Sequence, residues 1–505
     1  MPEQNSAQHA TDQTLADRAT NRSQRPTSPA FRAFIADRWA QRETRAVAPS
    51  VVAPFAADRR ARLGAQFPGE RLVLPAGTLV TRSNDTDYRF RPHSAFAHLT
   101  GLGTDEEPDA VLVLHPVPGG HEAVLYLRPP AGRDTEEFFA DSRYGEFWVG
   151  ARPGLDEIAD RTGLRTASID DLPDALVKDV GPDGVRLRVV PDADPTVTLL
   201  VDGARAGGDR PPAQDTKDDQ RLAEALSELR LVKDDWEVDQ MRAAVAATAA
   251  GFERVVRHLP RAAVHRRGER VIEAVFDGNA REEGNGVGYE TIAAAGDHAT
   301  TLHWIRNDGP VVPGDLVLID AGVEVESLYT ADVTRTLPVD GTFTEVQRRV
   351  YQAVLDAADA AFAAARPGAL FREVHAAAME VIADRLAGWG LLPGTAGESL
   401  STDGQFHRRW MVHGTSHHLG LDVHDCAQAR REMYLDAVLE PGMIFTIEPG
   451  LYFKADDLAV PQEYRGIGIR IEDDVLVTAE GNENLSAALP RRPDDVESWM
   501  RGLLG

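Results

Sequence analysis

The sequence predicts an α+β fold in two domains. At 505 residues the chain is too long for one average domain, so two are expected. Strand-like and helical stretches mix without strict alternation, which favours an α+β arrangement over a doubly wound sheet. Hydrophobic residues make up 43% of the chain, enough for large cores. We expect a disordered tail over residues 1–30, a smaller α/β domain over residues 31–220 and a larger α+β domain over residues 221–505.

The start of the chain changes character near residue 30. The tail before it is rich in Gln, Ser, Thr, Asp and Arg and has almost no large apolar residue, so it cannot bury enough surface to offset its chain entropy. Beyond it, four large apolar residues recur at helical spacing and predict a first amphipathic helix. They are Phe31, Phe34, Ile35 and Trp39.

The N-terminal domain contains a clear strand pair. Residues 110–114 and 123–127 are apolar and flank the breaker-rich stretch 116–120, which predicts two antiparallel strands joined by a loop. Residues 205–220 are polar and rich in Gly, Pro and Asp, so this stretch is the expected linker between the domains.

The second domain begins with helix-forming sequence. A long helical region starts near Leu229 and continues into an alanine-rich run. Two more helices are expected over residues 344–366 and 370–388, the second ended by Gly388 and Gly390. Strand-like runs lie around and beyond these helices.

The charge balance argues against polyanionic partners. With 54 basic and 80 acidic residues, the formal net charge is −26, so neither nucleic acid nor an anionic membrane is an expected partner. No apolar run is long enough to span a membrane, and no secretory signal is recognisable, so we expect a cytoplasmic protein. The single cysteine, Cys426, excludes an intrachain disulfide, and we interpret it as a structural thiol.

Five residues of the last third of the chain have the chemistry of a metal-ligand set. Asp320, Asp332, Glu448 and Glu472 each end or interrupt an apolar, strand-like run, and His417 lies between them in sequence. Ionised carboxylates are costly to bury without a counter-charge. Four of them with one imidazole fit divalent metal ions better than a salt-bridge cluster. The sequence from Asp320 to Asp332 also predicts a hairpin, which would bring those two aspartates together.

Two further patterns support this site. Side chains two apart on a strand share a face, so Arg470 and Glu472 should point together toward it. Four histidines fall within residues 413–424, a local excess in a chain with 15. The stretch lacks the His-Glu-x-x-His pattern of zinc proteases and the second glycine of a serine-hydrolase nucleophile elbow.

These residues lie in long motifs that closely resemble Xaa-Pro aminopeptidase (aminopeptidase P), a pita-bread metallopeptidase family. The resemblance covers roughly residues 55–495 and includes Val80-Thr-Arg-Ser-Asn-Asp in the first domain. It implies a pita-bread (creatinase/aminopeptidase) catalytic domain. The motifs are Asp320-Ala-Gly, Asp332-Val-Thr-Arg-Thr, His413-Gly-x-Ser-His417-x-Leu-Gly-Leu-Asp-Val-His424-Asp425, Glu448-Pro-Gly-Leu-Tyr and Arg465-Gly-Ile-Gly-Ile-Arg-Ile-Glu472-Asp-Asp.

The resemblance implies two divalent ions per subunit. Asp320 would bind one ion through both oxygens, Asp332 and Glu472 would bridge the two, and His417 and Glu448 would complete the second. This oxygen-rich set suits Mn²⁺, with Co²⁺ or Zn²⁺ as alternatives. The nucleophile would be a metal-bridging hydroxide.

The resemblance also implies catalytic roles. Glu448 would accept the proton of the attacking water and help pass it to the leaving nitrogen. His303, His413 and His424 match histidines that contact the substrate and steady the oxyanion. Arg470 matches an arginine that orients Glu472 or contacts substrate, and these two roles stay open.

The implied function is hydrolysis of the N-terminal Xaa-Pro bond of peptides, by a homodimer or homotetramer as in relatives. The nearest alternative is a prolidase, which shares the ligands but prefers Xaa-Pro dipeptides. A non-catalytic binding protein or a metal-free creatinase-like enzyme would lack ligands that are all present here. Ala97, His98 and His418 depart from the family pattern, and we expect the departures to bear on the substrate-length preference.

Overall fold

A computed structural model describes residues 26, 28–40, 47–181, 183–206 and 212–505 of the chain. The chain divides into two compact units, Met1–Leu222 and Ala223–Gly505. The expected disordered tail lies outside the described residues, apart from residues 26 and 28–30. Ser28 caps helix α2 (Pro29–Ala36), so a helix forms where one was predicted, although none of its residues is buried.

Unit 1 is built on a mixed five-stranded sheet with the order β6-β5-β4-β1-β7. β4 pairs with β5 and with β1 in antiparallel fashion, whereas the outer pairs β5–β6 and β1–β7 are parallel. The antiparallel pair β4–β5 confirms the predicted strand pair, with longer strands and a shorter turn. The strands are β1 (Glu70–Pro75), β2 (Thr81–Ser83), β3 (Thr86–Asp87), β4 (Val111–Val117), β5 (Gly120–Leu127), β6 (Arg165–Ser168) and β7 (Arg186–Val189).

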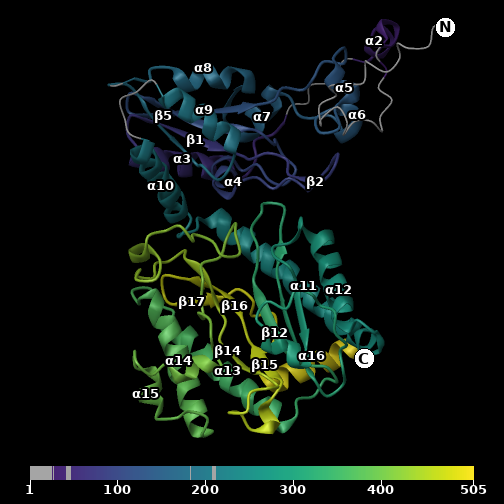
Figure 1. Cartoon of the computed structure of the whole chain (residues 1–505), viewed down its shortest axis with the longest axis vertical. Coiled ribbons are helices and arrows are strands. Elements are labelled where there is room, and N and C mark those ends of the chain that lie inside the picture. The colour runs from purple at the N-terminus through teal and green to yellow at the C-terminus, as the bar shows by residue number, and fades with distance from the viewer. Residues whose placement is uncertain (1–25, 27, 41–46, 182, 207–211) are drawn as a thin grey trace, which may run out of the picture. The chain divides into compact units, whose positions relative to one another are not determined.

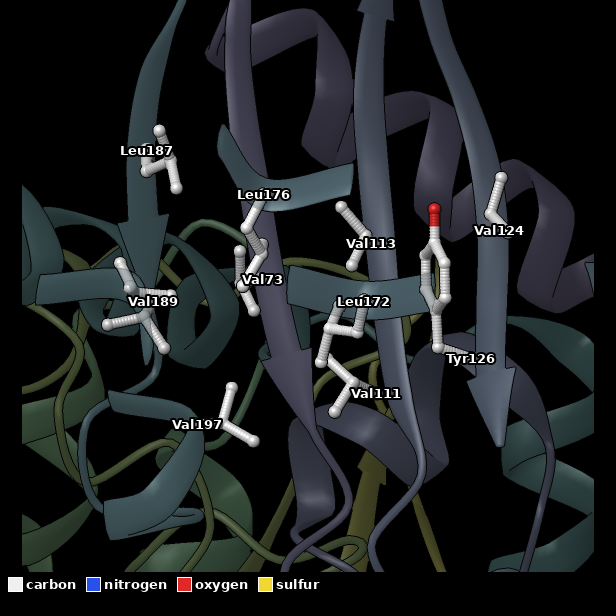
Figure 2. Packing of buried hydrophobic residues seen from close by; sticks show 11 residues of the cluster. Val73, Val111, Val113, Val124, Tyr126, Leu172, Leu176, Leu187, Val189 and Val197 are labelled. Carbon is white, nitrogen blue, oxygen red and sulfur yellow. The ribbon is translucent and has the colours of Figure 1, made fainter. Parts of the chain in front are cut away.

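Helices cover this sheet and make the unit α/β, as expected. Figure 2 shows one face, where Val73, Val111 and Val113 of the strands pack beside Leu172 and Leu176 from the overlying helix α8. Besides α2 and α10 (Pro212–Leu229), the described residues of unit 1 form seven α-helices. They are α3 (Ala53–Gln66), α4 (Ser94–Thr100), α5 (Glu136–Ala140), α6 (Glu146–Val149), α7 (Leu155–Thr162), α8 (Leu172–Val177) and α9 (Pro195–Arg205).

The stretch predicted as a linker is helical over much of its length. Residues 207–211 lie outside the described residues, but α10 (Pro212–Leu229) continues as one helix from Pro212. Proline is tolerated at the first position of a helix, and the following Ala, Gln, Lys and Leu residues have good helix propensity. The polar composition of residues 212–220 therefore belongs to a helix rather than to a loop.

Unit 2 places its strands among long helices (Figure 1). The helix pairs α11–α12 and α13–α14 make the most extensive contacts between helices in this unit. Their positions confirm the helices expected after Leu229 and over 344–366 and 370–388. The helices are α11 (Asp235–Val264), α12 (Gly268–Glu283), α13 (Glu345–Ala364), α14 (Phe371–Gly388), α15 (Ala396–Leu400) and α16 (Pro493–Leu504).

The long helices begin where the sequence supplies caps. The side chain of Asp234 accepts a hydrogen bond from the backbone N–H of Glu237, whose carboxylate returns one to the N–H of Asp234, at the start of α11. Thr344 and Gln347 form the same reciprocal pair at the start of α13. Each reciprocal pair, a capping box, satisfies backbone N–H donors that the start of a helix otherwise leaves unpaired.

The strands of unit 2 form several small sheets, including β12-β10-β9, β13-β16-β17 and β14-β15. β10 and β12 are antiparallel with Asp320 opposite Thr334, which confirms the predicted hairpin. The strands are β8 (Gly286–Val287), β9 (Ile292–Ala295), β10 (Leu316–Ala321), β11 (Val323–Glu324), β12 (Val333–Pro338), β13 (Ile444–Ile447), β14 (Gly450–Phe453), β15 (Ile467–Arg470), β16 (Asp473–Val477) and β17 (Asn482–Asn484).

A glycine allows this hairpin to close tightly. A Cβ atom at Gly322 would lie 1.6 Å from the carbonyl oxygen of Ala331, so any side chain would force the two segments apart. Gly322 therefore fixes the approach of the chain just before Asp332, and with it the spacing of the two aspartates.

One predicted strand is interrupted. Arg470 is the last residue of β15, and Glu472 lies in the short break before β16, so the two are not on one continuous strand as expected. β15 pairs with β14, whereas β16 pairs with β13, and the chain changes partner at this break. Glu472 consequently lies at the junction of two sheets.

Arg335 of β12 connects this junction to the segment just before α16. Its side chain is 1% exposed and donates to the carboxylate of Asp473 at 2.6 Å and to the carbonyl oxygen of Glu472 at 2.6 Å. It also donates to the carbonyl oxygens of Leu489 and Pro490. These oxygen acceptors surround the buried guanidinium of Arg335, so its positive charge is well compensated.

In the part of the chain that the structure describes, no helix combines the length and apolar character needed to cross a bilayer. The cytoplasmic location stays a prediction.

Candidate metal centre and active site

One cavity of about 650 Å³ in unit 2 gathers the residues that the sequence singled out. It lies where β10, the start of β12, the 413–424 loop and the segments after β13 and β15 meet. Its walls include all five expected ligands and all four of the other expected site residues. These are Asp320, Asp332, His417, Glu448 and Glu472, and His303, His413, His424 and Arg470.

Three of the expected ligands form the tightest group. One donor atom from each of Asp332, His417 and Glu472 lies within 4.8 Å of the others. Two ligands of one ion are separated by up to about 4 Å when each bond is about 2 Å long. Small side-chain adjustments would therefore let one ion contact all three.

A tyrosine connects Asp320 to this group. The hydroxyl of Tyr289 lies 2.6 Å from Oδ1 of Asp320 and 2.5 Å from Oδ1 of Asp332. The single hydroxyl group of Tyr289 is shared by the two carboxylates. This shared contact holds the aspartates side by side across the β10–β12 hairpin. The other carboxylate oxygen of each aspartate remains directed elsewhere.

His417 connects Glu448 to the same group. Its Nε2 lies 3.3 Å from Oδ2 of Asp332 and 3.5 Å from Oε1 of Glu448. Its Nδ1 lies 3.2 Å from the carbonyl oxygen of His418, which favours the tautomer with the proton on Nδ1. That tautomer leaves the Nε2 lone pair facing the carboxylates, as a metal ligand requires.

Arg470 orients two of the acids, Asp320 directly and Glu472 through Thr334. Its guanidinium donates to Oδ2 of Asp320 at 2.5 Å and to the hydroxyl of Thr334 at 2.9 Å, and that hydroxyl donates to Glu472 at 2.6 Å. Nε of Arg470 is 4.0 Å from Oε2 of Glu472. Thr334 thus relays the orientation of Arg470 to Glu472.

The electrostatics of the cluster call for more positive charge than the protein supplies. Burial, together with the charges of Asp332, Glu448 and Asp320, holds the pKa of Glu472 well above its usual range. Burial likewise raises the pKa of Asp320, and raises that of Glu448 to about 7. Carboxylates that resist ionisation when crowded are stabilised by cations. The donor set therefore fits divalent metal ions.

His413 stands at one side of the cavity as a neutral imidazole. Burial, with the positive charge of Arg470, lowers its pKa to about 3. Its Nδ1 is 3.5 Å from Oε2 of Glu448, and its Nε2 is 2.8 Å from the hydroxyl of Tyr452. Tyr452 also accepts a hydrogen bond from Arg470 at 3.2 Å. His413 is thereby fixed between Glu448 and Tyr452.

The loop that carries His303 is anchored by one buried acid. The carboxylate of Glu269, from α12, is 0% exposed and accepts from the backbone N–H groups of Ala295 and Gly309 at 2.9 and 2.6 Å. It also binds Nδ1 of His298 at 2.7 Å and Nε1 of Trp304 at 3.0 Å. Four contacts therefore hold both ends and the middle of the segment around His303.

The loop that carries His417 and His424 has its own anchor. The two rings lie 4.4 Å apart between centroids. Beneath them, Asp425 is 1% exposed, pairs with Arg230 at 2.9 Å, and accepts from the backbone N–H of Cys426 at 2.7 Å. Burial raises the pKa of the Cys426 thiol to about 12, which agrees with the structural role expected for this cysteine.

His418 does not itself line the cavity, and its effect on the substrate-length preference stays a prediction. This residue is fully buried and stacks on Phe371 with ring centroids 4.9 Å apart. Successive side chains of an extended segment point to opposite sides. Because His417 points into the cavity, His418 points into the core. Ala97 is likewise buried, within α4 of unit 1.

Three supporting residues were missed from the sequence. Thr334 and Tyr452 stand within quoted motifs, two residues after Asp332 and four after Glu448, so the motifs could have identified them. Tyr289 stands alone before β9 and has no such signal. Its role depends on the pairing of β10 with β12, which only the folded chain reveals.

The chain matches two known domain families. Residues 239–479 match metallopeptidase family M24, and residues 56–185 match the aminopeptidase P N-terminal domain. The metallopeptidase match contains all nine of the expected site residues. The second match falls within unit 1.

Relatives and solved structures with similar chains agree with these matches. The Xaa-Pro aminopeptidase 1 of Streptomyces coelicolor is 51% identical over 92% of this chain and 91% of its own length. The aminopeptidase PepP structure from Pseudomonas aeruginosa has a TM-score of 0.77 and 32% identity, covering 90% of this chain and 99% of that one. A zinc-substituted E. coli aminopeptidase P in complex with product has a TM-score of 0.75 and 31% identity, over 90% and 99% of the two chains.

Proposed function

The chain belongs to the Xaa-Pro aminopeptidase family of metallopeptidases, and on this premise we propose that it hydrolyses the N-terminal Xaa-Pro bond of peptides. The observation that carries the proposal is the convergence of four carboxylates and one imidazole on one cavity that also contains three other histidines. A metallo-aminopeptidase needs both parts, a cation site for the reaction and polar groups that orient the peptide.

The proposed ligands are Asp320, Asp332, His417, Glu448 and Glu472, which would hold two divalent ions. Asp332 and Glu472, which belong to the tightest group of donors, would be shared between the ions, as the family resemblance implies. When bound, such ions supply a water-derived nucleophile at neutral pH and polarise the scissile carbonyl. Mn²⁺ is the proposed ion, since oxygen donors outnumber nitrogen donors in this set.

The other residues would handle the proton and the peptide. Glu448 lies beside His413 and at the edge of the ligand group, where it can take a proton from water and give it to the leaving nitrogen of proline. His303 and His424 line the same cavity and would donate to the carbonyl oxygen and the peptide backbone. Arg470 would keep Asp320 and, through Thr334, Glu472 in their ligand positions.

A peptide panel with added metal tests this proposal. Purified protein supplied with Mn²⁺ should release free Xaa from Xaa-Pro-Yaa and much less from Xaa-Ala-Yaa. Faster cleavage of the Xaa-Pro dipeptide than of the tripeptide would instead indicate a prolidase. Absence of release with Mn²⁺, Co²⁺ and Zn²⁺ alike would overturn the proposed function.

We further propose that residues 31–220 form the non-catalytic domain and residues 221–505 the metallopeptidase domain, in a homodimer or homotetramer. The matched ranges, 56–185 and 239–479, fall inside these two domains. Light scattering of the purified protein would measure the assembly, and a monomeric mass would exclude it.

A further inference from the structure

A second cavity of unit 2, of about 560 Å³, lies against the first and has no role in the site described above. Leu302 lines both cavities. We name it the Lys454 pocket, and the residues that define it here are Thr300, Leu302, Trp410, Val412, Tyr452 and Lys454.

Tyr452 connects the Lys454 pocket to the active site. Its hydroxyl lies 2.8 Å from Nε2 of His413 and 3.2 Å from Arg470, both of which line the first cavity. Its side chain also lines the Lys454 pocket. The two cavities thus share a wall made of Leu302 and the Tyr452–His413 pair.

The leaving part of a peptide would run toward this wall. Under the proposed function, Glu448 delivers a proton to the proline nitrogen, so that nitrogen must face Glu448. Glu448 has two histidine neighbours at 3.5 Å, the proposed ligand His417 and the substrate-facing His413, and His413 contacts Tyr452. A chain that continues beyond proline in this direction would pass over this wall to reach the Lys454 pocket.

The walls of the pocket suit an extended peptide. Leu302, Trp410 and Val412 offer apolar surface, and the Val412 side chain is left exposed. Arg409 and Asp457 add no net charge, because they form a bidentate pair at 2.6 and 3.0 Å. The indole N–H of Trp410 also donates to Asp457, at 2.9 Å.

Lys454 is the cation of this pocket that is still available to a ligand. Its ammonium donates to the carbonyl oxygen of Thr300 at 3.3 Å, and it forms no ion pair in the part of the chain that the structure describes. Asp456 also lines the pocket, so the charged residues of the lining sum to zero and Lys454 acts as a local cation rather than through a positive field. An ammonium with one weak neutral partner can bind a carboxylate without breaking an existing ion pair.

We propose that the Lys454 pocket receives the residues that follow proline and that Lys454 binds the C-terminal carboxylate of short substrates. The inference rests on the proposed function and adds a substrate class to it, short peptides with a free C-terminus. Because the contact would be equally present in the ground state and the transition state, it should act through KM rather than kcat.

Matched substrates test the proposal. Xaa-Pro-Yaa peptides, and peptides one and two residues longer, would be compared as free acids and as C-terminal amides. At one of these lengths the wild type should favour the acid about three- to fivefold in kcat/KM, as for a partly exposed ion pair. The preference should shrink between about 0.05 M and about 0.5 M salt, because exposed charges are screened.

Lys454→Gln should bring the acid-to-amide ratio close to one, and Lys454→Arg should restore part of the preference. The control is Arg366→Gln, which removes an exposed cation of unit 2 that donates to a carbonyl oxygen and lies outside both cavities. An unchanged ratio in Lys454→Gln at every length would overturn the proposal while leaving the proposed function intact. Failure to cleave acids and amides alike would instead overturn the proposed function on which it rests.

Discussion

Arg230 and Asp425 form a buried ion pair, 2.9 Å from Nε to Oδ1, directly beneath the loop that carries His417 and His424. Asp425 is 1% exposed, and its carboxylate also accepts hydrogen bonds from the backbone N–H groups of Leu421 and Cys426. The residue next to His424 in sequence therefore links this loop to the segment between α10 and α11.

Removing one partner of this pair should be costly. Asp425→Ala leaves a buried guanidinium with only the more distant carboxylate of Asp422, at 3.8 Å, and we expect a loss of about 3–5 kcal/mol in the free energy of unfolding of unit 2. Urea denaturation measures it. Glu483→Ala, which breaks the exposed pair with Arg242 at 2.9 Å, is the control and should cost less than about 1 kcal/mol. Equal losses in the two variants would refute a special role for the buried pair.

Metal binding should depend on the central acids. Wild-type protein with Mn²⁺ at about one hundred times its Kd should gain about 3 kcal/mol of stability by mass action. Asp332→Ala should lose both activity and most of this gain, because it removes a proposed shared ligand. Differential scanning calorimetry with and without Mn²⁺ measures the gain. Asp340→Ala, which removes an exposed acid after β12, should behave like the wild type, and a normal turnover in Asp332→Ala would exclude the ligand assignment.

Glu269 should affect substrate binding without affecting the metal site. Glu269→Ala removes all four contacts to the segment around His303, and displacement of a positioning loop can cost up to about 100-fold in kcat/KM. We expect this loss together with an unchanged Kd for Mn²⁺. Steady-state kinetics and metal titration measure the two quantities. Glu282→Ala, at the exposed end of the same helix α12, should change neither, and a weakened Mn²⁺ affinity in Glu269→Ala would contradict this assignment.

Glu107 should make the stability of unit 1 depend on pH. Burial raises its pKa to about 7, against the opposing charges of Arg152 and Arg161. The folded state therefore keeps a proton that the unfolded state releases near the ordinary glutamate pKa of 4.5, so stability falls as the pH rises from there to about 7. Glu107→Gln should remove this loss, which is up to about 3 kcal/mol at pH 8. Unfolding midpoints of variant and wild type should therefore diverge with rising pH, and a constant difference would contradict the expectation.

The sequence predicted the elements that rest on local patterns. The strand pair β4–β5, the helices α13 and α14 and the β10–β12 hairpin follow from periodicity and turn residues near one another in the chain. The expected site residues also line one cavity, because motifs as long as His413–Asp425 identify them together.

The sequence could not supply what depends on distant partners. The break at Glu472 arises because β15 and β16 join different sheets, and the strand-like alternation Ile469-Arg-Ile-Glu472 does not reveal that change. The 212–220 segment is polar yet helical, since composition alone does not separate a solvated helix from a linker. Tyr289 acquires its place only when Asp320 and Asp332 meet.

Arg335 has a consequence for biosynthesis. Two of its acceptors are the carbonyl oxygens of Leu489 and Pro490, which the ribosome adds 154 and 155 residues after Arg335 itself. A buried guanidinium without its acceptors is costly, so the junction around β12 and Glu472 cannot close until those residues have emerged. The full set of Arg335 contacts around β12 and Glu472 can therefore form only once the chain has been synthesised through Pro490.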